Sequence, residues 1–365
     1  MADAATEPAV EAVSLLVPST IKALHALEFA ARHISPTSLP RLIDAMAGRD
    51  EEAKAALEAS RAIDWPDRLK PVRDCLEPAA EAVISGLAGL RAAPEAPQPI
   101  VAAYRALRSH ARAAQSIYPM ASLLKPVSQF FLERSARDDA ALLQRLENAA
   151  AAPSDIGVIH VGGPPGTRGG FSLYVPETYD DSRAWPLVVA LHGGSGNGGA
   201  FLWSWVREAR TRGAIVLAPT AIGSTWSLME PEVDGPSIDA MVEQVAARWN
   251  LDPGRRLLTG MSDGGTFTYV LGLRGDCRFT HLAPVAAAFH PMLLTFADAD
   301  RLRGLPIHIV HGTQDWMFSA ALAREAERTL AGAGAKVVYR EIPDLSHTYP
   351  RDENGALLDW FGVGL

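Results

Sequence analysis

The feature that most constrains the fold is an alternation of short apolar runs and helical stretches in the second half of the chain. Six runs are nearly continuous in apolar residues, as in strands buried on both faces: 186–193, 214–220, 256–262, 281–287, 306–312 and 336–342. Stretches with helical spacing separate them, at 200–212, 236–249, 264–273, 320–333 and 357–361. Such alternation predicts a mostly parallel sheet flanked by helices, an α/β fold. Ligands in this architecture bind beyond the carboxyl ends of the strands.

Two shorter β-branched runs precede the first of these strands. They span 157–163 and 171–177, and a glycine-rich linker joins them. Short strands joined by such a linker are typical of antiparallel pairs. We therefore predict an antiparallel edge to the sheet.

The first 152 residues have a different texture, rich in Ala, Leu, Glu and Arg, with few glycines. Apolar residues recur at helical spacing and prolines act as breakers or first-turn residues. The predicted helices are 20–33, 39–46, 50–60, 71–90, 100–116 and 128–149. Because 365 residues exceed the roughly 250–300 at which one core stops growing, we predict two domains. They are an all-helical domain at 1–152 and an α/β domain at 153–365, with the boundary near Pro153.

Charge and cysteine content exclude several classes of function. The net charge is −8 and the basic residues are scattered, so nucleic acid is not an expected partner. Two cysteines without a CxxC or a nearby histidine pair indicate neither a disulfide framework nor a zinc site. An acidic N-terminus with a short, proline-interrupted apolar patch differs from a secretory signal. No run approaches the ~20 apolar residues of a membrane span, so we expect a cytoplasmic protein without an integral membrane segment.

A serine lies between two glycines where the predicted strand 256–262 gives way to a helix. The segment Gly260-Met261-Ser262-Asp263-Gly264 matches G-x-S-x-G. Flanking glycines allow a sharp, strained turn that exposes the serine hydroxyl and directs the free N–H groups of the helix at the space before it. The pattern alone is also that of an ordinary tight turn. In this context it predicts a nucleophile.

Two further residues follow in the order that this architecture uses, which is Ser, then Asp, then His. Asp315 lies just beyond the strand 306–312, where a carboxylate can orient a histidine, although it could instead cap the following helix. His347 lies in a loop after the strand 336–342, where a general base can be carried. His290, which also follows a strand, is the alternative base.

Glycines after another strand complete the predicted site. In LHGGSGNGG (191–199) the backbone can approach the serine closely. We predict that the N–H groups of Gly194 and Asp263 bind the oxyanion that develops on a substrate. The loop lacks the G-x-G-x-x-G and GK[ST] patterns of nucleotide-binding loops.

From about residue 157 to 365 these motifs resemble the α/β-hydrolase superfamily. Within it they resemble the phospholipase/carboxylesterase and polyester-depolymerase-like esterases, whose LHGxxG, GxSxGG, HGxxD and SH elements occur here in that order. The resemblance implies a Ser262, Asp315, His347 triad that cleaves small or medium carboxylic esters through an acyl-enzyme, without a metal or organic cofactor. The first 150 residues match nothing in that pattern. We expect them to supply a homo-oligomer interface or a cap over the site.

The sequence also suggests a substrate pocket and two alternative functions. Trp226, Trp316 and Phe318 could form an aromatic wall for an acyl or aryl group, although buried aromatic residues usually belong to the core. One alternative function is an assembly protein whose hydrolase domain is inactive. The other is a serine peptidase on the same fold.

Overall fold

The computed structural model describes residues 6–149 and 155–364, and its contacts divide the chain into two compact units. The first unit is Met1–Asp139 and the second is Ala140–Leu365. The predicted boundary between residues 152 and 153 lies outside the described residues. The division assigns the helix α8 (Ala140–Asn148) to the second unit.

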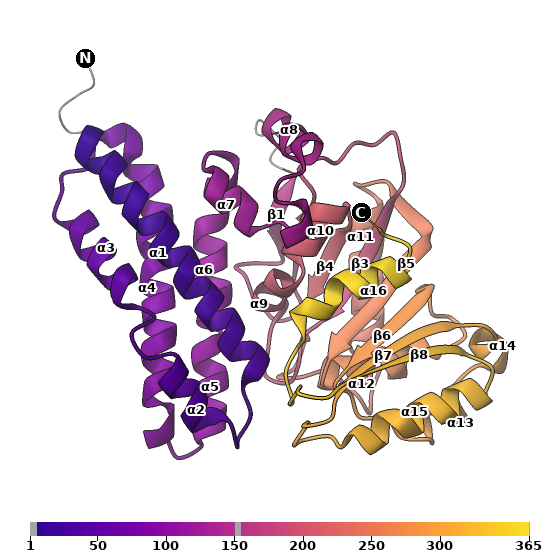
Figure 1. The fold of residues 1–365 in the computed structure, drawn as a ribbon. Coiled ribbons are helices and arrows are strands. Elements are labelled where there is room, and N and C mark those ends of the chain that lie inside the picture. Colours follow the sequence, from indigo (N-terminus) through magenta and orange to yellow (C-terminus); the bar gives the residue numbers. More distant parts are fainter. Residues whose placement is uncertain (1–5, 150–154, 365) are drawn as a thin grey trace. The chain divides into compact units, whose positions relative to one another are not determined.

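The first unit is built from helices (Figure 1), as predicted for this region. Its α-helices are α1 (Thr6–His33), α2 (Leu39–Ala45), α3 (Glu51–Arg61), α4 (Lys70–Ala92), α5 (Pro99–Leu107), α6 (Ser109–Ile117) and α7 (Lys125–Phe130). Helix α1 packs against α3, α4 and α6, and α4 also packs against α5 and α6. The stripes of Ala and Leu seen in the sequence form the buried faces, with Leu24, Leu27 and Leu87 fully buried.

Two of the predicted helices are wrong as continuous elements. The predicted helix 128–149 is broken into α7, a 3-10 turn (Arg134–Ala136) and α8. Phe130, Phe131 and Leu132 are all buried, and three consecutive residues cannot share one face of a helix that has 3.6 residues per turn. The predicted helix 100–116 is divided at Arg108 into α5 and α6.

Helix α1 begins fourteen residues earlier than the predicted start at Thr20, and it continues through Pro18. By length and composition it is apolar enough to cross a membrane, a property that the sequence reading did not assign to any segment. Half of the most apolar window is buried inside the unit, and a core helix passes the same test. The length of the helix therefore says little about a membrane.

The second unit contains an eight-stranded sheet in the order β1-β2-β4-β3-β5-β6-β7-β8. Its strands are β1 (Gly157–Val161), β2 (Phe171–Val175), β3 (Trp185–Leu191), β4 (Ile215–Pro219), β5 (Leu251–Met261), β6 (His281–Val285), β7 (Pro306–Gly312) and β8 (Lys336–Ile342). Strand β2 pairs antiparallel with β1 and β4, and all other pairs are parallel. The predicted parallel sheet and its antiparallel edge are confirmed.

The predicted helix 200–212 is broken by a 3-10 turn (Leu202–Ser204), and the short helices at 293–296 and 299–302 were not predicted. Otherwise helices follow the strands as the sequence predicts. They are α9 (Gly198–Phe201), α10 (Val206–Arg212), α11 (Gly235–Ala246), α12 (Asp263–Gly272), α13 (Leu293–Phe296), α14 (Ala299–Leu302), α15 (Ala320–Gly332) and α16 (Asn354–Trp360). Helices α10 and α16 are joined by an ion pair between Arg212 and Asp359. The side chain of Asn354 also donates to the carbonyl of Ser204, at 2.7 Å.

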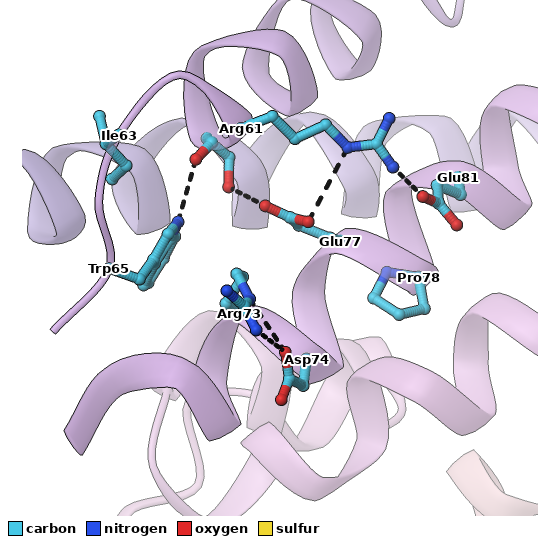
Figure 2. A pocket seen from close by; sticks show the side chains of 9 residues that line it. Arg61, Ile63, Trp65, Arg73, Asp74, Glu77, Pro78 and Glu81 are labelled. Carbon is cyan, nitrogen blue, oxygen red and sulfur yellow. Dashed lines mark hydrogen bonds and ion pairs between the residues drawn. The ribbon is translucent and has the colours of Figure 1, made fainter. Parts of the chain in front are cut away.

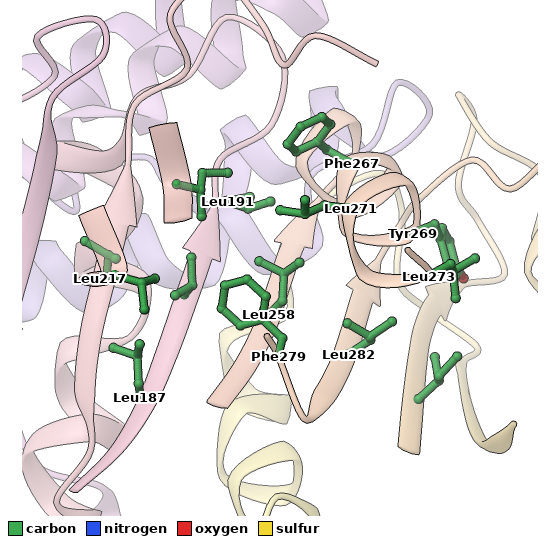
Figure 3. Close-up of a cluster of buried hydrophobic side chains, with 14 of the residues drawn as sticks. Leu187, Leu191, Leu217, Leu258, Phe267, Tyr269, Leu271, Leu273, Phe279 and Leu282 are labelled. Carbon is green, nitrogen blue, oxygen red and sulfur yellow. The ribbon is translucent and has the colours of Figure 1, made fainter. Parts of the chain in front are cut away.

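The core of this unit follows the two-residue period of its strands. Leu187, Val189 and Leu191 of β3 point into one large apolar cluster, whereas Val188 and Ala190 belong to the opposite face. The cluster continues through Leu258 and Leu282 to Phe267 of α12 (Figure 3). It also includes buried side chains of α11 and α15. Buried residues of α10 and α16 are outside it and cover the other face. Burial on both faces holds the carboxyl ends of the strands at one rigid edge.

Strand β8 differs from its prediction as a strand buried on both faces. Its residues alternate between exposed and half-buried, and only Ile342 at its end is buried. Because β8 pairs with β7 alone and closes the sheet, its outer side has no neighbouring strand. Charged side chains such as Arg340 and Glu341 are typical of such an edge.

We expect the central and edge strands to respond very differently to truncation. Leu258→Ala removes a fully buried side chain of β5 and should lower the free energy of unfolding by about 2–5 kcal/mol. Val338→Ala on β8, where the side chain is 43% exposed, should change it by no more than about 0.5 kcal/mol. Urea unfolding followed by circular dichroism measures both. Equal losses would contradict the packing described here.

Candidate active site

Ser262 lies at the turn between β5 and α12, in a backbone conformation that a side chain rarely adopts. Its φ is 55° and its ψ is −119°, and it caps α12. A Cβ atom at Gly260 would overlap the backbone of Gly264, and one at Gly264 would overlap the carbonyl of Leu191 at the end of β3. The N–H of Ser262 donates to the carbonyl of Val285 in β6, at 2.9 Å. The glycines are therefore required by close packing, and the strained turn is fixed between two strands.

The turn that carries Asp315 and the loop that carries His347 are joined through their backbones. The N–H of Thr313 donates to the carbonyl of Ile342 (2.9 Å), and that of Gln314 donates to the carbonyl of Leu345 (3.0 Å). Gly312 allows this approach, since a Cβ atom there would overlap the carbonyl of Leu345. Two segments far apart in the sequence thus form one structural element beside Ser262.

The three predicted side chains meet in one hydrogen-bonded line. Nδ1 of His347 is 2.8 Å from Oδ2 of Asp315, and Nε2 is 3.0 Å from Oγ of Ser262. All three residues are buried. An ionised carboxylate only accepts hydrogen bonds, so Nδ1 carries the ring proton and Nε2 accepts from the serine hydroxyl. This tautomer is the one in which the imidazole can take the proton of Ser262.

Asp315 is held in its ionised form. Burial by itself raises its pKa, but the hydrogen bond from His347 and the electrostatic interaction with it outweigh burial, and the pKa lies below the ordinary value of 3.8. Its Oδ1 also accepts from the N–H groups of Met317 (2.9 Å) and Phe318 (2.8 Å). Carboxylate oxygens with several donors stay charged. The helix-capping role considered from the sequence is wrong, because Ser319 caps α15 and the two bonds to Oδ1 lie within the turn before that helix.

His311 packs behind this carboxylate. Its Nε2 is 2.8 Å from the carbonyl of Phe318 and 3.4 Å from Oδ2 of Asp315. Burial lowers the pKa of the His311 ring, which favours the neutral form. A neutral ring donates its one N–H to the carbonyl of Phe318 and so holds the Asp315 turn closed.

The predicted oxyanion donors lie on two segments that pack together. Asp263 is the first residue of α12, and a Cβ atom at Gly194 would be 2.7 Å from Oδ2 of Asp263. Within residues 6–149 and 155–364, neither N–H of the two residues has a hydrogen-bond acceptor. A free amide at the N-terminus of α12 and a second free amide on the adjacent loop, next to a serine, can stabilise a developing negative charge.

Thr225 is a site residue that the sequence reading missed. Its hydroxyl donates to Oδ2 of Asp263 at 2.6 Å, which fixes a carboxylate that would otherwise be free to turn towards the oxyanion space. The loop after β4 ends at the same edge of the sheet as Ser262. That placement was the available signal, but the sequence alone does not say which loop residue makes the contact.

The three predicted aromatic residues have different environments. Trp226 is 3% exposed, donates its indole N–H to the carbonyl of His192 (2.7 Å) and stacks on Phe267. It is a core residue that braces the loop of Gly194, so its prediction as a pocket wall is wrong. Phe318 lies edge-on to the ring of His347, with ring centroids 5.3 Å apart. Trp316 lies 6.5 Å from it and is 45% exposed.

The rival histidines have other partners. His290 is exposed, and its Nδ1 accepts from the N–H of Met292 within its own turn. His192 is buried, and its Nε2 accepts from the N–H of Ala221 at 3.1 Å. Of the histidines in the described part of the chain, His347 is the one that reaches Ser262.

The helical unit contains hollows of its own. One of about 470 Å³ lies between α3 and α4 (Figure 2). Arg61 pairs there with Glu77 and Glu81, and Arg73 pairs with Asp74. No histidine is among the lining residues, and each charged side chain already has an opposite partner. This hollow offers no group of altered reactivity comparable to those around Ser262.

Asp315 should make stability dependent on acid pH. Because its native pKa lies below 3.8, the unfolded chain binds a proton in the window just below 3.8 while the native chain does not. The contribution of Asp315 to the free energy of unfolding is therefore fully present above that value, and it is lost as the pH is lowered through the native pKa. Asp315→Asn should show a shallower fall in urea unfolding between about pH 5 and 2.5. Asp300→Asn, at an exposed site, should keep the wild-type slope, and identical slopes for Asp315→Asn and wild type would refute the shift.

Comparison with known proteins gives partial matches. No family model matches the chain. A probable feruloyl esterase C of Aspergillus terreus is 34% identical over 116 residues, which is 30% of this chain and 43% of that protein. A bifunctional acetylxylan esterase/xylanase of Neocallimastix patriciarum is 31% identical over 150 residues, or 39% of this chain and 21% of that protein. The chain thus spans less than half the length of these relatives.

Solved structures are similar at a greater distance. An acetyl xylan esterase from Aspergillus awamori covers 57% of this chain and 100% of its own, with 16% identity and a TM-score of 0.46. A thermostable esterase covers 57% of this chain and 62% of its own, with 21% identity and a TM-score of 0.45. These values are too low to support a functional argument. The fold is defined by the sheet itself. Its eight strands run in the order 1-2-4-3-5-6-7-8, the second is antiparallel to its neighbours, and a serine turn follows the fifth. This is the α/β-hydrolase fold.

Proposed function

We propose that the protein is a serine esterase that hydrolyses small or medium carboxylic esters through an acyl-enzyme. One observation carries the proposal, namely the buried line from Ser262 through His347 to Asp315, with contacts of 3.0 and 2.8 Å. The free amides of Gly194 and Asp263 beside it can donate hydrogen bonds to the negative oxygen that forms during ester hydrolysis. The partial similarity to feruloyl and acetylxylan esterases is consistent with ester substrates.

In the first step Oγ of Ser262 attacks the ester carbonyl while Nε2 of His347 takes the hydroxyl proton. The carbonyl oxygen becomes negative and is held by the N–H groups of Gly194 and Asp263. The C–O bond to the alcohol then breaks, and His347 returns its proton to the leaving oxygen. The acyl group remains on Ser262.

In the second step water replaces the alcohol. His347 removes a proton from a water molecule, which attacks the acyl carbonyl, and the bond to Ser262 breaks as the serine regains its proton. Asp315 stays ionised throughout and stabilises the charged ring. His311 and the amides of Met317 and Phe318 keep that carboxylate in place.

The first test removes the nucleophile. Ser262→Ala should lower kcat on a 4-nitrophenyl ester by a factor on the order of 10⁶, because the remaining groups act only through binding and the oxyanion donors. Ser224→Ala, at an exposed serine in the loop after β4, should retain wild-type kcat. More than a tenth of wild-type turnover in Ser262→Ala would eliminate the assignment. His347→Ala and His290→Ala, compared in the same assay, separate the two candidate bases.

A fluorophosphonate probe distinguishes the proposal from an inactive scaffold. Labelling should occur at Ser262, disappear in Ser262→Ala and persist in Ser224→Ala, with peptide mapping as the measurement. Absence of labelling in the wild type would favour an assembly role. Hydrolysis of amide substrates at rates comparable to esters would favour a peptidase.

For the helical unit we propose a homo-oligomer interface. Val10, Leu15 and Phe29 of α1 are exposed apolar side chains, and burial between copies would remove them from water. Light scattering of the full chain measures its mass, and a monomer at micromolar concentration would rule out this role. A location in the cytoplasm stays a prediction from the sequence.

A further inference from the structure

The methionines of the chain divide into two groups by position. In the part that the structure describes, Met46, Met120 and Met241 are buried core residues. The other four all lie at the carboxyl edge of the sheet, where Ser262 lies. They are Met229 after β4, Met261 before Ser262, Met292 after β6 and Met317 after β7.

Exposed apolar side chains concentrate on the same three loops. Met229 is 93% exposed, Met292 63% and Met317 50%. Nine large apolar side chains are exposed in the described part of the second unit. Seven lie in the segments that follow β4, β6 and β7, six on loops and Phe296 at the end of α13: Ile222, Met229, Val233, Met292, Phe296, Trp316 and Met317. Such a gathering on one edge marks a binding surface rather than the scattered exposure of an ordinary surface.

Hydrogen bonds tie each of these loops to the residues around Ser262. The loop after β4 is joined to the start of α12 through Thr225 and Asp263. The loop after β6 is joined to the first turn of α12 by the bond from the N–H of Ala288 to Oγ1 of Thr266, at 3.1 Å. The loop after β7 carries Asp315 itself, with Met317 donating its N–H to that carboxylate. Each loop that carries an exposed methionine is thus bonded to the start of α12 or to the Asp315 turn.

The chemistry of these loops favours one kind of ligand. Methionine is unbranched and polarisable, so it adapts to apolar groups of varied shape. Glu230 and Glu232 follow Met229 on its loop, and the carboxylate of Asp263 is bonded to Thr225 of the same loop. Carboxylates at this edge repel an anion, so a neutral ester is favoured and the carboxylic acid formed from it is released.

We infer that Met229, Met292 and Met317, the methionine rim, bind the bulky apolar part of a neutral ester and set the preference of the enzyme for such esters over short ones. This role rests on the proposed esterase activity and adds the class of substrate to it. Trp316, next to Met317 and beside His347, forms the aromatic end of the rim. The rim acts outside the reacting atoms, so its effect lies in substrate binding rather than in bond breaking.

The test compares 4-nitrophenyl octanoate with 4-nitrophenyl acetate on the full-length protein. The triple variant Met229→Gln, Met292→Gln, Met317→Gln keeps the length of the side chains but makes them polar. The ratio of kcat/KM for octanoate to that for acetate should fall about tenfold, since lost apolar contacts change discrimination by about this factor. The change should appear in KM for octanoate. The triple Met→Leu variant should hold the ratio within about twofold.

Val338→Gln, at an exposed apolar site on β8 away from this edge, is the matched control and should leave the ratio at the wild-type value. Circular dichroism checks that each variant is folded. An unchanged ratio in the folded glutamine triple, or an equal fall in the Val338→Gln control, would overturn the inference while the esterase proposal stands. If the wild type hydrolyses neither ester, both are overturned, because the rim then has no ester to bind.

Discussion

The site depends on one steric constraint, the approach of the turn after β5 to the end of β3. Only glycine fits at 260 and 264, because a side chain would overlap the backbone of the first helical turn or the carbonyl of Leu191. The same approach forces Ser262 to a φ of 55°. It also places the first amide of α12 beside the loop of Gly194. Strain at the serine, its outward direction and the free amides therefore have a common cause, which is the packing of two backbones without side chains between them.

Much of the second unit could be predicted because its physical signals are local. Strands buried on both faces appear as apolar runs, and each of the eight strands overlaps a run that the sequence predicts, although β5 begins five residues earlier than its run. The meeting of Ser262, Asp315 and His347 is a consequence of parallel strands, whose carboxyl ends share one edge of the sheet. Each of the three follows a different strand, so a correct sheet brings them to that edge. The order of the motifs along the chain then favours His347 over His290.

What the sequence did not predict depends on contacts between loops. Trp226 looks like a candidate pocket residue until its indole N–H is seen on the carbonyl of His192. The bond from Thr225 to Asp263 joins residues 38 positions apart, and no periodic pattern marks it. In the helical unit, the run Phe130 to Leu132 has helical composition but must bury three consecutive side chains, which breaks the helix. Strand β8 carries Lys336, Arg340 and Glu341 among its seven residues, a signal of an edge strand that the prediction of burial on both faces passed over.

The backbone bonds between 313–314 and 342–345 have a consequence for how this protein can vary. These bonds hold the turn of Asp315 and the loop of His347 together directly. The 26 residues between Asp315 and the last residue of β8 therefore only have to begin and end at these two fixed points. Helix α15 lies within this segment, so it could lengthen, shorten or change its surface without separating Asp315 from His347. A motion that opens the edge of the sheet should likewise move the two loops together. A change in structure is therefore more apt to displace Ser262 from His347 than to separate His347 from Asp315.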